Sequence, residues 1–141
     1  MATEVEIWKA IDTGSEAEEY LERALEKLNK AKGWGIADIL GGKAVVTAIK
    51  RGYMNDAQEL IDQGYQYLQE FSIMLNGTGL DYRIDGDDGM TLHVMDYAMD
   101  NMITDIMTQS RINDTINEVR QTIKEVDDTI HSLQDELWRM K

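Results

Sequence analysis

The chain has 141 residues, and its 27 acidic residues against 14 basic residues leave a formal charge of −13. This length fits one domain, residues 1–141, with a core large enough to need no disulfides, and the chain contains no cysteine and no proline. The charge argues against nucleic acid and polybasic membrane contacts, and the missing thiols exclude cysteine catalysis and sulfur-bound zinc.

The N-terminal segment is acidic, whereas a signal peptide begins with basic residues followed by an apolar run. An apolar stretch of the roughly 18 residues that a membrane span needs is also missing. We therefore expect a cytoplasmic protein with no membrane span. Ile7, Trp8 and Ile11 have helical spacing, which favours a short leading helix over the first thirteen residues.

A first long helix is predicted over residues 15–32. Ser15 and Glu18 have the spacing of a capping box, which marks a helix start. The apolar residues that follow step alternately by four and three: Ala17, Leu21, Ala24, Leu28 and Ala31. Gly33 suits the C-cap, and the glycine-rich stretch after it predicts a structural hinge at Gly33, Trp34, Gly35, Gly41 and Gly42, followed by a short helix over 43–50.

A second helix is predicted from Asn55 to Gly77. Its apolar seam has the same stepping: Ala57, Ile61, Gly64, Leu68, Phe71 and Leu75. Gly64 stands on this seam, where the missing side chain lets a neighbouring group come close, so we expect a close-packing point there.

Residues 80–94 alternate between apolar and polar around Gly86 and Gly89, which predicts a small β-hairpin in competition with a helix that begins near Thr91. Beyond it, Asp96 and Asp100 lie one helical turn apart, and His93 lies close before them. With Glu59 or Asp62 from another helix, these carboxylates could hold Mg or Mn, since hard cations prefer oxygen ligands. The alternative is that the acids favour the positive end of a helix dipole.

The C-terminal segment has the clearest pattern. Its seam keeps a four-three spacing over about four heptads: Ile112, Ile116, Val119, Ile123, Val126, Ile130, Leu133 and Leu137. A continuous helix over 95–140 would be roughly 70 Å long. Such a helix must bend near Ser110 to complete a monomeric bundle, or find a partner that covers the seam.

Two stretches resemble a group of small uncharacterised bacterial helical proteins. They are Trp34-Gly-Ile-Ala-Asp38-Ile-Leu-Gly-Gly42, between two predicted helices, and Asp96-Tyr-Ala-Met-Asp-Asn-Met-Ile-Thr-Asp105. The resemblance covers about residues 15–120 and implies an all-helical fold. It implies no activity, substrate or cofactor.

These patterns together predict an all-α protein, an antiparallel helical bundle with a long C-terminal heptad helix. The function expected is that of a non-enzymatic interaction or scaffold protein without a cofactor, which binds a protein partner or a second copy, as a homodimer, through the C-terminal seam. The alternative is a Mg- or Mn-dependent hydrolase of a phosphoanhydride, such as a nucleotide, that uses the helix-borne carboxylates.

Overall fold

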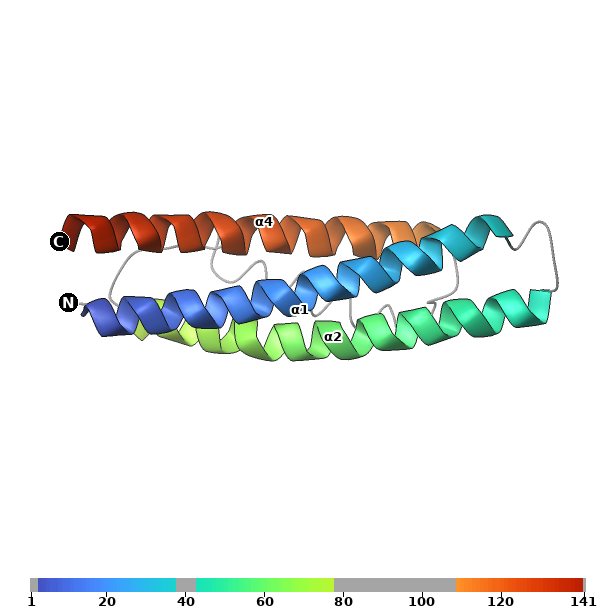
Figure 1. Ribbon diagram of the computed structural model, residues 1–141, viewed down its shortest axis with the longest axis horizontal. Helices are drawn as coiled ribbons and strands as arrows, with labels where there is room; N and C mark the ends of the chain where they lie inside the picture. The colour runs from blue at the N-terminus through green and yellow to red at the C-terminus, as the bar shows by residue number, and fades with distance from the viewer. Residues whose placement is uncertain (1–2, 38–42, 78–108, 141) are drawn as a thin grey trace.

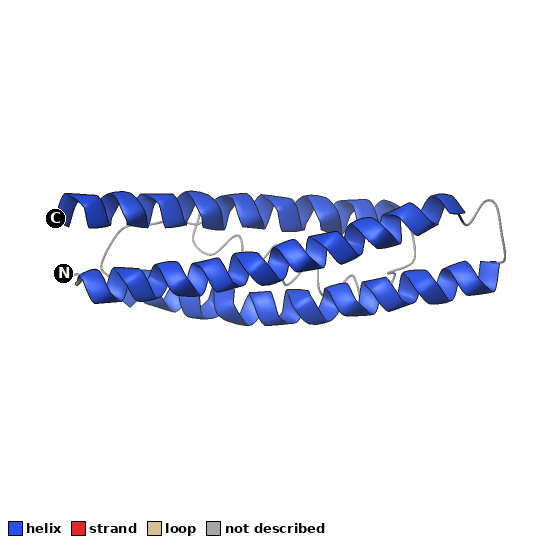
Figure 2. Ribbon diagram, viewed as in Figure 1, coloured by secondary structure: helices blue, strands red, loops and turns tan. Residues whose placement is uncertain are grey.

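The computed structural model describes residues 3–37, 43–77 and 109–140, and in these ranges it consists of three long helices. They are α1 (Glu4–Ala37), α2 (Lys43–Gly77) and α4 (Gln109–Met140). Figure 1 shows α1 between the other two, with both of them antiparallel to it, and α1 contacts each of them. The described part of the chain contains no strand (Figure 2), so the prediction of an all-α helical bundle is confirmed.

The predicted short leading helix and the helix predicted from Ser15 form one continuous helix, α1, which begins at Glu4. Thr3 caps it: its hydroxyl oxygen accepts a hydrogen bond from the amide of Glu6 (3.2 Å), and its carbonyl accepts one from the amide of Ile7 (3.1 Å). Ile7 and Ile11 are buried and extend the core seam toward the N-terminus. Burial on a continuous seam therefore overrides the capping signal at Ser15, which lies inside the helix.

The C-terminal end of α1 and the N-terminal end of α2 also extend beyond their predicted limits. Helix α1 continues through Gly33, Trp34 and Gly35, so the end predicted at Lys32 is wrong and these three hinge residues have helical backbone. Gly41 and Gly42 lie outside the described residues. Helix α2 joins the predicted short helix over 43–50 to the predicted helix from Asn55, and it ends at Gly77 as predicted. Without proline, each interior glycine costs the helix only about 1 kcal/mol.

Helix α4 buries a wider face than the predicted seam. Thr115, Thr122 and Thr129 repeat every seven residues beside that seam and are all buried. The hydroxyl of Thr122 donates to the carbonyl of Glu118 (2.9 Å), and that of Thr129 to the carbonyl of Glu125 (2.8 Å). Because the helix's own carbonyls accept these bonds, threonine can occupy the core without an unpaired hydroxyl. The predicted extension back to residue 95 and the hairpin over 80–94 lie outside the described residues.

Two glycines bring α1 and α2 close together. A Cβ atom on Gly14 would lie 2.9 Å from Cε1 of Phe71 on α2 and 3.1 Å from Cδ1 of Ile130 on α4. A Cβ atom on Gly64 would lie 3.0 Å from Cδ2 of Leu21 on α1, which confirms the predicted close-packing point. On each helix, a bulky side chain of the other helix fills the space beside a glycine, and we call this space a glycine notch. The two glycine notches lie one heptad apart along the pair.

Gly14→Ala should destabilise the protein although alanine is the better helix former. The new methyl group must displace the fully buried ring of Phe71, and overpacking of this kind typically costs about 1–3 kcal/mol. Alanine recovers about 1 kcal/mol of helix propensity, so we expect a net loss of up to about 2 kcal/mol in urea unfolding. Gly52→Ala is the matched control: it lies inside α2 with no atom within 4 Å of an added Cβ and should raise stability. Equal changes in the free energy of unfolding for both variants would contradict tight packing of Phe71 against Gly14.

Candidate functional site

The predicted C-terminal interaction seam lies in the core of this chain. Seven of its eight residues are buried, and Ile123 packs against the core while partly exposed. Because other helices of the chain cover the seam, these side chains are buried without a binding partner. The buried members are Ile112, Ile116, Val119, Val126, Ile130, Leu133 and Leu137.

The predicted metal ligands Asp96, Asp100 and His93 lie outside the described residues. Their proposed helpers Glu59 and Asp62 lie on α2, where burial and then the charge of Glu59 raise the pKa of Asp62 above its ordinary value. Over residues 3–37, 43–77 and 109–140, no cluster of three or more metal-binding side chains forms. In the same ranges no helix combines the length and the apolar character that a membrane crossing requires.

A second surface emerges where α1 and α2 meet on their outer side. On α2, Tyr53, Leu60, Tyr67 and Met74 repeat every seven residues beside the core seam. Their neighbours on α1 also recur at helical spacing. We call this surface the tyrosine face and define it by Thr13, Tyr20, Arg23, Lys27 and Lys30 of α1 with Tyr53, Leu60, Tyr67 and Met74 of α2. The seven-residue repeat on α2 indicates only one half of this face, because the other half depends on how α1 is aligned with α2.

The centre of the tyrosine face is a stacked ring pair. The ring centroids of Tyr20 and Tyr67 lie 5.5 Å apart with an interplanar angle of 14°, and both residues are half-buried. The guanidinium of Arg23 lies 5.6 Å from the centroid of the Tyr20 ring, within the range of a cation–π contact. Toward the chain termini, the hydroxyl of Thr13 donates to the carbonyl of Lys9 (2.9 Å), and its oxygen lies 3.3 Å from Sδ of Met74. The face is therefore held in place by contacts between its own members.

Two lysine side chains lie near the ring of Tyr53, the third tyrosine of the face. Nζ of Lys27 and Nζ of Lys30 lie 6.0 and 5.9 Å from the ring centroid of Tyr53, and Lys27 also pairs with Asp56 at 3.9 Å. Beside them is an open groove of about 300 Å³, lined by Arg23, Lys27, Asp56, Glu59, Leu60 and Gln63. A second hollow, of about 190 Å³, lies at the other end of the face and is lined by Glu6, Lys9, Met74 and Gly77.

The chemistry of the tyrosine face suits binding. Tyr20, burial, Glu16 and Glu70, in that order, raise the pKa of Tyr67 above its usual range, so its hydroxyl stays protonated at neutral pH. A protonated phenol donates and accepts hydrogen bonds but is a poor nucleophile. Aromatic rings next to guanidinium and ammonium groups are the side chains that protein interfaces favour.

An acidic pair joins α1 to α4 on another side of the molecule. The carboxyl group of Glu18 on α1 lies near that of Asp127 on α4, and two neighbouring carboxyl groups favour the protonated form of one of them. Oε1 of Glu18 is buried without a hydrogen-bond partner. Burial, followed by the charge of Asp127, its hydrogen bond and the charge of Glu22, raises the pKa of Glu18 to about 7, while His131 opposes the rise.

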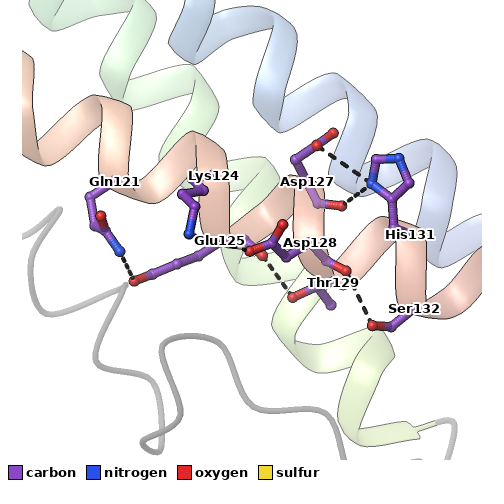
Figure 3. A network of polar contacts seen from close by, with 8 residues as sticks. All are labelled: Gln121, Lys124, Glu125, Asp127, Asp128, Thr129, His131 and Ser132. Atoms are coloured by element: carbon purple, nitrogen blue, oxygen red, sulfur yellow. Dashed lines mark hydrogen bonds and ion pairs between the residues drawn. The ribbon is translucent and has the colours of Figure 1, made fainter.

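His131 accompanies this pair from α4. Its Nδ1 lies 2.8 Å from the carbonyl oxygen of Asp127 and 3.4 Å from the carboxylate of the same residue, as Figure 3 shows. The carbonyl first, and then the carboxylate of Asp127, raise the pKa of the imidazole. Figure 3 also shows contacts within α4 from Gln121 to Glu125, from Lys124 to Asp128, and from Thr129 and Ser132 to backbone carbonyls one turn before them. The cluster thus brings titratable groups of α1 and α4 together.

Comparisons with protein-family models, with curated proteins and with solved structures found no match to this chain. The surfaces described above are therefore the features that indicate a function.

Glu18→Gln should change how stability depends on pH. The folded chain holds the Glu18 proton more tightly than the unfolded chain, so this stabilising contribution is present below about pH 4.5 and is lost as the pH rises through about 7. Glutamine resembles the protonated acid and cannot ionise. Because Glu18 is partly exposed, solvent screening limits the effect, and we expect the variant to gain about 1 kcal/mol relative to the original chain between pH 5 and pH 8. Urea unfolding at both pH values measures this gain.

The control for this measurement is Glu19→Gln, which changes an exposed acid at the adjacent position of α1. It should shift stability by a similar amount at both pH values. If the two variants show the same pH dependence, the pKa of Glu18 is not raised in the folded chain.

Proposed function

We propose that this chain is a non-enzymatic helical-bundle protein that acts by binding another protein through the tyrosine face. The observation that carries the proposal is the Tyr20–Tyr67 stack, which is half-exposed and flanked by Arg23. Aromatic and arginine side chains supply most of the binding energy in many protein interfaces. Here they are already ordered by contacts within the chain, so less conformational entropy is lost when a partner binds.

The proposal keeps the association expected from the sequence and moves it to another surface. The C-terminal seam is covered by the chain itself, whereas Tyr20, Tyr53, Tyr67 and Met74 stay partly exposed. The hydrolase alternative depends on Asp96 and Asp100. Because these residues lie outside the described ranges, the structure adds no observation in favour of that activity.

A photocrosslinking side chain at a single position tests the proposal in the cell. We expect p-benzoylphenylalanine in place of Tyr67 to give a discrete covalent adduct after irradiation, because a bound partner would lie against this ring. The readout is the position of the tagged chain on a denaturing gel.

The same substitution at Asn117, an exposed residue of α4, is the control and should give no discrete adduct. Adducts at neither position, or equal adducts at both, would contradict binding through the tyrosine face.

A further inference from the structure

Charge is segregated along the α1–α2 pair although the whole chain is strongly acidic. The end where α1 finishes and α2 begins comprises residues 23–37 and the residues of α2 level with them, 43–64, and it carries seven basic and four acidic residues. The other end of the pair, residues 4–22 and 65–77, carries eight acidic residues and one basic residue. The two ends of the pair therefore have formal charges of +3 and −7, within a chain of −13.

The tyrosine stack lies where the sign of the charge changes. Thr13 lies opposite Met74, and Tyr20 lies opposite Tyr67, which fixes the antiparallel register of the two helices. In this register Arg23 is about one turn from the stack toward the basic end. Glu16 and Glu70 are about one turn from it toward the acidic end, and all three charged side chains are exposed.

We propose that the partner of the tyrosine face is a second copy of this chain, packed face to face with its helices antiparallel to those of the first. This inference depends on the proposed function, because it names the occupant of the same face. A twofold axis at the Tyr20–Tyr67 stack brings Arg23 of each copy level with Glu16 and Glu70 of the other. The twofold rotation therefore places the basic end of each copy against the acidic end of the other, as an interface between identical surfaces requires.

The whole outer side of the α1–α2 pair, with the tyrosine face at its centre, is large enough for a stable dimer. Helices of 34 and 35 residues are about 50 Å long, and two side by side are about 20 Å wide. The contact then buries on the order of 1,000 Å² per copy, compared with about 800 Å² in a typical specific interface. At physiological ionic strength the Debye length is about 8 Å, so charges in contact outweigh the long-range repulsion between two acidic chains.

Charge exchange between two variants tests this arrangement. In sedimentation at physiological salt we expect the original chain to dimerise. Arg23→Glu alone, and Glu16→Lys combined with Glu70→Lys, should each weaken self-association by about tenfold or more, because like charges then meet across the axis. An equimolar mixture of the two variants should dimerise again, since each interfacial pair has opposite charges in the mixed dimer.

Arg120→Glu on α4 is the matched control: it reverses an exposed arginine outside the tyrosine face and should leave the dimer unchanged. Circular dichroism checks that every variant remains helical. A strictly monomeric chain, or variants that fail to recover in the mixture, would overturn the antiparallel dimer. If the Tyr67 crosslink then forms at a mass other than twice that of the chain, the tyrosine face still binds a protein and only its assignment to a second copy fails.

Discussion

The reciprocal packing of two glycines against two bulky side chains fixes how α1 and α2 lie together. Phe71 occupies the notch at Gly14, and Leu21 occupies the notch at Gly64, with van der Waals distances that leave no room for a Cβ atom at Gly14. Both notches set the same antiparallel register. If either helix shifted, Phe71 and Leu21 would meet residues that have a Cβ atom in place of the glycines. Ile130 reaches the Gly14 notch as well, which ties α4 to the same point.

This register also determines what the outer side of the pair presents to solvent. It aligns Thr13 with Met74 and Tyr20 with Tyr67, and the ring stack forms because both tyrosines stand next to the core seam on facing helices. The interior and the tyrosine face are therefore not independent. A change that loosens the glycine packing would also separate the rings that form the candidate binding surface.

The sequence predicted the fold better than the site, for physical reasons. Heptad spacing identified the core because burial of that seam dominates the free energy of a helical bundle. The capping signal at Ser15 gave the wrong start for the helix. Ser15 has the local chemistry of a cap, but the buried Ile7 and Ile11 continue the seam before it. The burial of Thr122 and Thr129 was not predicted because threonine is polar. In the structure, their hydroxyls donate hydrogen bonds to carbonyls of the preceding turn. The tyrosine face needs the register of two helices, which one helix's spacing cannot supply.

The electrostatics of the molecule differ between its two helix pairs, and the difference favours the α1–α2 side for recognition. Between α1 and α4, Glu18 faces Asp127, an arrangement that costs free energy when both groups ionise and is retained because the surrounding core holds the helices together. Along the α1–α2 pair, the net charge is positive at one end and negative at the other. A parallel pairing of two such faces would place like charges together at both ends, whereas an antiparallel pairing places unlike charges together. The segregation thus selects orientation, which apolar contacts alone would leave undetermined.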